Sequence, residues 1–259
     1  MLPYTVCYTC SAGCINGLGK KVVDVTNFTS YLVGYVRARL LDEETNLPFQ
    51  SDLAALASSD MAIDTLRRIL QASAPDPEPW EIGESLAECL LEEEHDIKWP
   101  WNMERDKRTR KACLPGADLI GFIKTDDTTI FVLGEVKTSE DKASPPNIMY
   151  GRSGMIYQLD RLANNLQIHY SLIKWLWVRC KNTEFWPLYE EATRNYLNSE
   201  GKKVALFGIL MRDTIPNQFD LKSRATALSA VVQKPTNVEL YAWYLPHPIN
   251  NWPSLVIKV

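Results

Sequence analysis

The sequence predicts an α/β protein in which a central mixed sheet is covered by helices, with a small mixed α/β segment before it. After residue 78, segments with helical spacing alternate with short runs of β-branched and aromatic residues, in the order helix, hairpin, helices, strand, helix, strand. That alternation is typical of a sheet packed against helices and not of a β-sandwich or a helical bundle.

A proline-rich stretch divides the chain. Ala74 to Pro79 holds three prolines in six residues, which excludes a helix interior and predicts a stiff extended connector. We therefore expect an N-terminal appendage over 1–73 and a main domain over 78–259. The sequence assigns the appendage a role in recruitment or regulation only by default.

Composition and charge limit the classes of protein. The chain has 259 residues, 46% of them hydrophobic, so it can form a full core. Its net charge of −4 argues against a strongly basic nucleic-acid coat or a polybasic membrane binder. No apolar run approaches the roughly 18 to 20 residues of a membrane helix, and no secretory signal is visible. We expect a cytoplasmic protein with no membrane partner.

The appendage shows short elements of both kinds. Residues 5–9 and 21–26 are rich in β-branched or aromatic side chains and predict two strands. Apolar residues recur at helical spacing over 31–40 and over 61–70, which predicts two helices.

The main domain begins with a helix and a hairpin. Pro79 can occupy the first turn of a helix over 78–94, which has an apolar face. Residues 117–124 and 129–137 then predict two strands that pair as an antiparallel hairpin, because 125–128 is a turn-type tetrapeptide. The remaining predicted elements are helices over 153–165, 168–178, 184–197 and 221–232, and strands over 203–211 and 238–245.

The hairpin carries the candidate chemistry. Glu135 and Lys137 share one face of the second strand because side chains alternate with a period of two. Asp118 begins the first strand, so antiparallel pairing brings it beside Glu135. Paired carboxylates hold Mg²⁺ or a similar hard cation such as Mn²⁺, and the Val136 carbonyl is a further candidate oxygen ligand. The lysine can orient a water or stabilise charge on a phosphoryl oxygen.

This arrangement resembles a known family. Pro115-Gly-Ala-Asp118 followed by Gly134-Glu-Val-Lys137 is similar to the motif of the PD-(D/E)xK nuclease superfamily. The resemblance implies a restriction-endonuclease-like αβββαβ core, divalent metal at Asp118 and Glu135, and a catalytic role for Lys137.

Two further residues match positions of that family. Glu84, in the pair Gly83-Glu84 on the helix before the hairpin, corresponds to an additional metal-binding glutamate. Gln158 corresponds to a helical glutamine that many members carry after the Glu-x-Lys strand. The overall layout looks like the HamA-like (DUF1837) nuclease subunits of Hachiman anti-phage defence, which implies a DNA substrate and a helicase partner.

Basic residues precede the hairpin. They are interleaved with Trp99 and Trp101 and predict contacts with the phosphate backbone of DNA. The residues are Lys98, Arg105, Lys107, Arg108, Arg110 and Lys111. The alternative is a solvated loop whose tryptophans pack on the core.

Other interpretations stay open at this point. Glu135 and Lys137 can form an ordinary surface ion pair, and the fold can serve as a non-catalytic DNA-binding or partner-binding subunit. A stand-alone restriction endonuclease would have the same site. Cys7, Cys10 and Cys14 are spaced closely enough to share a metal if another ligand came from elsewhere. The sequence does not decide the oligomeric state.

Overall fold

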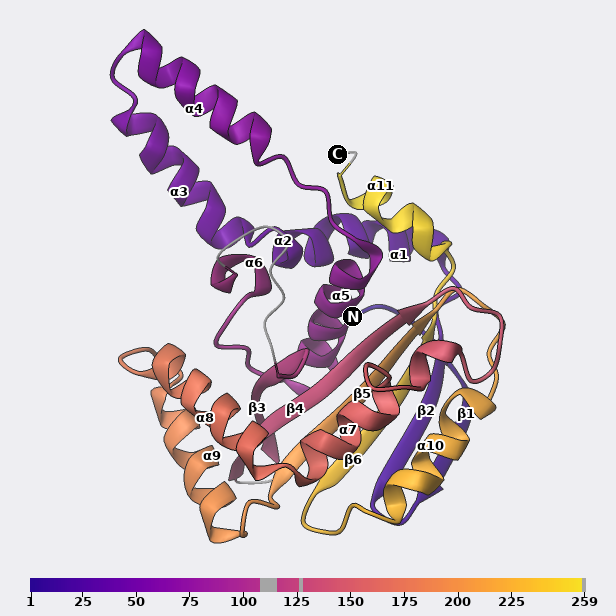
Figure 1. Cartoon of the computed structure of the whole chain (residues 1–259). Coiled ribbons are helices and arrows are strands. Elements are labelled where there is room, and N and C mark those ends of the chain that lie inside the picture. Colours follow the sequence, from indigo (N-terminus) through magenta and orange to yellow (C-terminus); the bar gives the residue numbers. More distant parts are fainter. Residues whose placement is uncertain (108–115, 126–127, 258–259) are drawn as a thin grey trace.

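A computed structural model describes residues 1–107, 116–125 and 128–257. They form one six-stranded sheet in the order β1-β2-β6-β5-β4-β3, which confirms the predicted α/β class with a mixed sheet (Figure 1). The strands are β1 Thr5–Ala12, β2 Ile15–Lys21, β3 Leu119–Thr125, β4 Thr128–Ser139, β5 Val204–Arg212 and β6 Asn237–Tyr244. The four central strands are parallel to one another, and the two edge strands β1 and β3 are antiparallel to their neighbours.

Helices cover both faces of this sheet (Figure 1). One face packs against α1 Val25–Tyr31, the π-helix η1 Leu32–Val36, α5 Pro79–His95 and α11 Trp252–Ile257. The other face packs against α7 Met155–Asn164, α8 Leu166–Cys180, α9 Trp186–Asn198 and α10 Phe219–Ser229. The short helices are α2 Arg37–Leu40, α6 Met103–Asp106, η2 Asn147–Met149 and η3 Ile249–Asn251.

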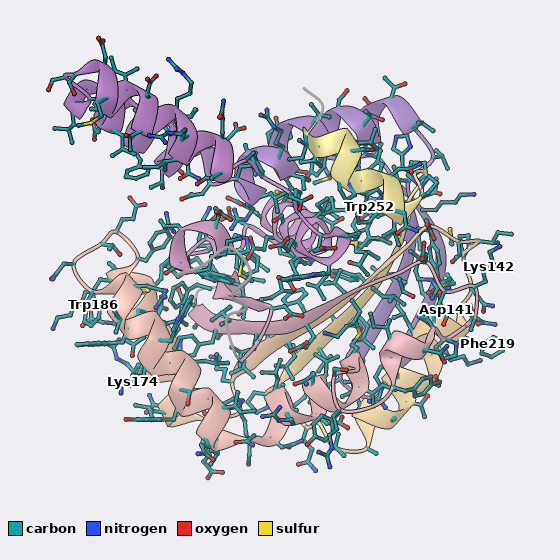
Figure 2. The ribbon with its side chains drawn as sticks, turned by 45° about the horizontal axis from the view of Figure 1, so that its top comes forward. Asp141, Lys142, Lys174, Trp186, Phe219 and Trp252 are labelled. Atoms are coloured by element: carbon teal, nitrogen blue, oxygen red, sulfur yellow. The ribbon has the colours of Figure 1, made fainter. Side chains whose placement is uncertain are left out.

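The alternation of side chains along β4 assigns the two cores. Val132 and Val136 pack into the core under α5, whereas Phe131 and Leu133 pack into the core under α7 to α9. All residues of β5 are buried, as expected for a central parallel strand with helices on both faces. On the α5 side, Trp252 of α11 is fully buried and packs edge-on against Phe28 (Figure 2).

The N-terminal hairpin belongs to the main sheet. β2 pairs in parallel with β6 over its full length, with Ile15 opposite Val238, so the sheet crosses the predicted boundary between 1–73 and 78–259. The predicted strand at 21–26 is wrong. β2 ends at Lys21, and Asp24 then begins α1 by accepting a hydrogen bond from the Asn27 N–H. This cap outweighs the β propensity of the valines around it.

A helical arm separates from this body. α3 Glu43–Leu56 was not predicted, and it forms a hairpin with α4 Asp60–Ala72, close to the predicted helix at 61–70. Neither helix contains a buried residue. The two helices extend away from the sheet and its covering layers (Figure 1).

The main-domain elements appear in the predicted order, and a short bridge lies beside the hairpin. The sequence of elements is α5, β3, β4, α7 to α9, β5, α10 and β6. Lys98 makes an isolated antiparallel bridge with Phe122, in which two N–H···O bonds of 2.8 and 3.0 Å run in opposite directions. The resemblance predicts three strands between the first helix and the next. The described residues show two strands and this bridge on the outer side of β3.

Within the described ranges, no helix is both long and apolar enough to cross a membrane.

We predict that the fragment 78–259 does not fold cooperatively by itself. Removing residues 1–77 takes away β1, β2 and α1, and exposes one edge of β6 together with the core around the fully buried Phe28 and Ile15. The cooperativity of thermal unfolding is measured by circular dichroism during heating. As a control, replacing 43–72 with a short Gly-Ser linker should retain cooperative unfolding, because no residue of α3 or α4 is buried. A fragment 78–259 that melts as the full chain does would contradict the prediction.

Candidate active site

The β3–β4 hairpin brings the first two candidate residues together. Leu119 is paired with Gly134, and one residue earlier the Asp118 N–H donates to the Gly134 carbonyl at 3.1 Å. The Asp118 carboxylate in turn accepts a hydrogen bond of 2.9 Å from the Val136 N–H. The aspartate is therefore fixed against the backbone on both sides of Glu135, which is the neighbourhood that the hairpin pattern predicts.

Lys137 completes the cluster. Its ammonium nitrogen lies 2.9 Å from Glu135 Oε2 and 3.5 Å from Asp118 Oδ2. Glu135 and Lys137 are two residues apart on one strand, so both side chains leave the sheet on the same side. The structure thus joins Asp118, Glu135 and Lys137 in one group of two carboxylates and one ammonium.

Burial and mutual charge shift the pKa values of Glu135 and Lys137. Glu135 is only 4% exposed, and its pKa is raised to about 8, mainly by burial and then by the Asp118 charge, against an opposing contribution from Lys137. Burial alone would lower the pKa of Lys137, but the charges of Asp118 and Glu135 outweigh it and raise the pKa. Lys137 is therefore held as a cation.

Glu84 approaches this group from helix α5. Its pKa is raised to about 9, mainly by burial and then by the negative charges of Asp118 and Glu88, against an opposing contribution from Lys137. The helix comes this close because residue 83 is glycine: a Cβ there would collide with Thr138 Oγ1 on β4. The close approach of α5 to the end of β4 explains why Glu84 shares the field of the other three residues.

The donor atoms suit a hard divalent cation. Asp118 and Glu135 offer carboxylate oxygens, the ligands that Mg²⁺ and Mn²⁺ prefer. Among the described residues, however, no three His, Cys, Asp or Glu side chains are arranged to hold a metal ion. The structure therefore does not bring Glu84 into one ligand group with the other two carboxylates, although it lies within their electrostatic reach.

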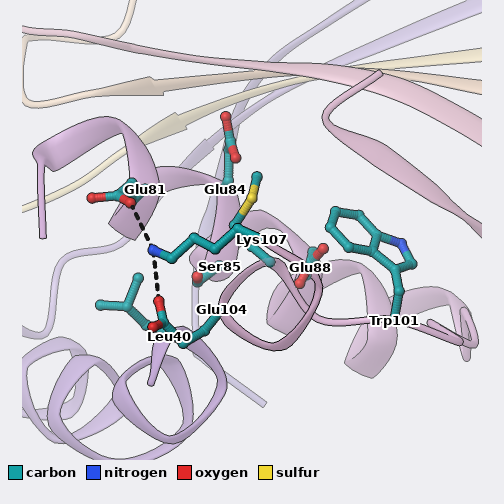
Figure 3. Close-up of a pocket in the computed structure, with 9 residues that line it drawn as sticks. Leu40, Glu81, Glu84, Ser85, Glu88, Trp101, Glu104 and Lys107 are labelled. Atoms are coloured by element: carbon teal, nitrogen blue, oxygen red, sulfur yellow. Dashed lines mark ion pairs between the residues drawn. The ribbon is translucent and has the colours of Figure 1, made fainter. Parts of the chain in front are cut away.

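A small acidic pocket lies along α5 next to Glu84 (Figure 3). Lys107 reaches across it, with its ammonium 3.6 Å from Glu81 and 2.6 Å from Glu104. On another side of the pocket, Glu88 is paired with Arg39. Sequence reasoning missed the Arg39–Glu88 pair because the two residues are 49 positions apart and no local pattern connects them.

The predicted DNA-binding cluster is only partly described. Arg108, Arg110 and Lys111 lie outside the described residues. Lys98 forms a 2.6 Å ion pair with Asp96, and Arg105 lies 3.9 Å from Asp106. Lys107 is 8% exposed and paired as above, so it does not present a free ammonium at the surface as the prediction requires.

The two tryptophans of this cluster pack on the core, as the alternative interpretation holds. Trp99 and Trp101 are both buried. Their indole N–H groups donate to the carbonyls of Glu88 at 3.2 Å and Ile120 at 2.7 Å. Neither ring is available to stack on a base.

Gln158 is engaged within its own segment. Its amide nitrogen donates to the Arg152 carbonyl at 2.7 Å, and its amide oxygen accepts a 3.4 Å hydrogen bond from Arg161. In the described part of the chain it makes no hydrogen bond to the carboxylates or to the lysine of the candidate site.

The N-terminal cysteines make no metal group in the described ranges. The Cys14 thiol donates to the Val232 carbonyl at 3.5 Å, and Cys7 is exposed on strand β1. Cys10 fits against Gly17 of the neighbouring strand. Packing against Gly17 accounts for Cys10, and the contact with the Val232 carbonyl accounts for Cys14.

No protein-family model matches this chain, and no curated protein matches it.

We predict that Gly83→Ala destabilises the protein by about 1–3 kcal/mol, because the added methyl group must push α5 away from Thr138. Chemical unfolding measures the change. Gly34→Ala is the matched control, since a Cβ at Gly34 meets no atom within 4 Å and alanine is the better helix former. Equal changes in the free energy of unfolding for the two substitutions would show that the close contact between α5 and β4 does not require glycine at position 83.

The raised carboxyl pKa values predict that stability falls with pH. In the unfolded chain Glu84 and Glu135 ionise near their usual value of 4.5, whereas the folded chain keeps them protonated to about pH 9 and about pH 8. Between about pH 4.5 and pH 9 the folded state therefore binds more protons than the unfolded state. The free energy of unfolding decreases as pH rises through this range and levels off above it. Urea unfolding at pH 5, 7 and 9 should show a smaller decrease for Glu84→Gln than for the exposed control Glu44→Gln. Identical slopes would overturn the assignment.

Proposed function

We propose that this chain is a divalent-metal-dependent nuclease that hydrolyses DNA phosphodiester bonds. The observation that carries the proposal is the convergence of Asp118, Glu135 and Lys137 at one position of the hairpin, within hydrogen-bonding or ion-pairing distance. In a largely buried setting, two carboxylates can coordinate Mg²⁺ or Mn²⁺, and an ammonium beside them can contact a phosphate. An ordinary surface ion pair would not raise the pKa of its glutamate.

Each residue has a distinct role in this proposal. Asp118 and Glu135 would hold the cation, which stabilises charge on a phosphoryl oxygen and lowers the pKa of bound water. The Val136 N–H keeps the Asp118 carboxylate in place. Lys137, held as a cation, donates hydrogen bonds to an attacking water or to a phosphate oxygen. Glu84 keeps its proton up to about pH 9 in the metal-free chain, and a bound cation would favour its ionised form, which adds negative charge from α5.

The arrangement of elements supports the same family. Helix α5, the hairpin, the helices α7 to α9 and the parallel strand β5 follow in the order of the αβββαβ core, with two strands in place of the three between its helices. The Lys98–Phe122 bridge stands antiparallel to β3, where a further strand of the meander would pair. We propose that this bridge is a reduced form of that strand.

A non-catalytic subunit is the second candidate function. It is favoured by the ion pairs that Lys137 makes with both carboxylates, and by the finding that no three ligand-type side chains in the described ranges are arranged for a metal. The role in anti-phage defence and the helicase partner depend on the resemblance alone and stay predictions.

We predict metal-dependent cleavage of DNA by the purified chain. Supercoiled plasmid, linear duplex and single-stranded DNA are incubated with Mg²⁺, Mn²⁺ or EDTA, and products are separated on gels. Glu135→Ala or Lys137→Ala should lower the rate by about 10²-fold or more, because each removes charge from the reacting centre. Glu140 and Lys142 form an exposed Glu-x-Lys pair just beyond β4, so Glu140→Ala and Lys142→Ala are matched controls (Figure 2 labels Lys142).

Metal binding separates the two candidate functions. Calorimetry with Mn²⁺ should detect binding to the unaltered chain and to Lys137→Ala, but not to Glu135→Gln or Asp118→Asn. Cleavage that is absent although metal binds would indicate a partner-dependent enzyme. The absence of both would favour the non-catalytic subunit.

A further inference from the structure

The α3–α4 arm is built as an unpartnered surface. Neither helix has a buried residue, and the arm leaves the body beside α2 without packing on the sheet (Figures 1 and 2). Helices in proteins owe most of their stability to tertiary packing of an apolar face. Because α3 and α4 form a hairpin with each other and do not pack on the sheet, much of their apolar surface stays exposed to solvent.

Both helices carry an apolar stripe that the hairpin covers only in part. Phe49, Leu53 and Leu56 recur on α3 at spacings of four and three residues, which places them on one side of the helix. Leu53 is half-buried, whereas Phe49 and Leu56 are 54% and 78% exposed.

The same pattern occurs on α4. Ile63, Leu66 and Leu70 follow at spacings of three and four residues, with Leu66 half-buried and the other two exposed. Leu47, Met61 and Ile69 are additional exposed apolar side chains of the arm. Apolar side chains gathered in this number on a surface mark an interaction site, whereas single ones do not.

The charge of the arm restricts what can bind there. Residues 43–72, which span α3 and α4, contain five acidic residues and two basic ones, Arg67 and Arg68, a net charge of −3 in a chain whose total is −4. DNA is repelled by such a segment, and a second copy of the arm carries the same charge. A partner with positive charge is attracted to it.

We propose that the α3–α4 arm docks a basic amphipathic helix of a partner protein. The apolar side of that helix covers the exposed ends of the α3 and α4 stripes, and its Lys or Arg residues face Asp52, Asp60 and the other carboxylates of the arm. The charge pairs steer the encounter, while the buried apolar side chains supply the affinity. This proposal goes beyond the nuclease function and does not depend on it.

A defined peptide tests the apolar part of this surface. The probe is a fluorescein-labelled amphipathic Leu/Lys helix of about 18 residues, or five turns, and binding to the full chain is followed by anisotropy. A Leu/Glu peptide of the same pattern and a Leu/Lys peptide with the pattern scrambled are the controls.

Two pairs of substitutions examine the two stripes. At least one of two double substitutions should weaken binding of the Leu/Lys peptide about tenfold or more, because apolar contact area is lost. The pairs are Phe49→Ser with Leu56→Ser, and Ile63→Ser with Leu70→Ser. Leu197→Ser with Ile215→Ser is the matched control at exposed apolar positions elsewhere. Unchanged binding in both arm pairs, or the same loss in the control, would overturn the proposal.

The charge is examined in the same way. Asp52→Lys with Asp60→Lys should weaken binding and reduce its dependence on salt, whereas Glu184→Lys with Glu190→Lys makes the same change of charge outside the arm. Equal effects of the two pairs would mean that the peptide responds only to the total charge of the protein, and this would overturn the proposal. Sedimentation that shows dimers dissociated by the arm substitutions would identify a second copy as the occupant instead.

Discussion

The register of the β3–β4 hairpin is the constraint on which the candidate site depends. Leu119 lies opposite Gly134, and this pairing places Asp118 beside Glu135 and Lys137. A slip of one residue would turn Glu135 and Lys137 to the other face of the sheet, into the core under α5. Gly134 fits this pairing, because a Cβ at that position would crowd Leu119 Cδ1 of β3 and collide with the Phe207 carbonyl of β5 on the other side.

Once the register is set, the charges must be compensated at short range. Glu135 is almost fully buried, so its ionised form needs a partner, and Lys137 is the nearest one. Glu84 lies on a different element and makes no direct ion pair with Lys137 among the described contacts. If all three carboxyl groups were ionised, one ammonium would face three negative charges, and the raised pKa values of Glu84 and Glu135 reflect that imbalance. A bound divalent cation would supply the missing positive charge and favour the ionised carboxylates, which is the physical basis for proposing a cation at this group.

The sequence predicts the parts of this molecule that depend on local pattern. The hairpin, the α5 helix and the trio of Asp118, Glu135 and Lys137 follow from strand alternation and turn chemistry, and the structure has them within a few residues. It does not predict what depends on distant pairing. Nothing local indicates that β2 joins β6, more than 200 residues away, or that Lys107 reaches back to Glu81 on α5. Helix α3 contains Pro48, and a proline inside a segment argues against a helix there.

The uneven distribution of charge changes how the net charge of −4 is interpreted. A negative total argues against tight binding of DNA if the charge is spread over the surface. Here residues 43–72 account for −3 of that total, and they lie on an arm that leads away from the sheet (Figure 1). Helix α3 has 14 residues and is therefore about 20 Å long, whereas the screening length at physiological salt is about 8 Å. The outer acidic residues of the arm thus contribute little to the field that a phosphate would meet at Asp118 and Lys137, and the body that carries the site is close to neutral.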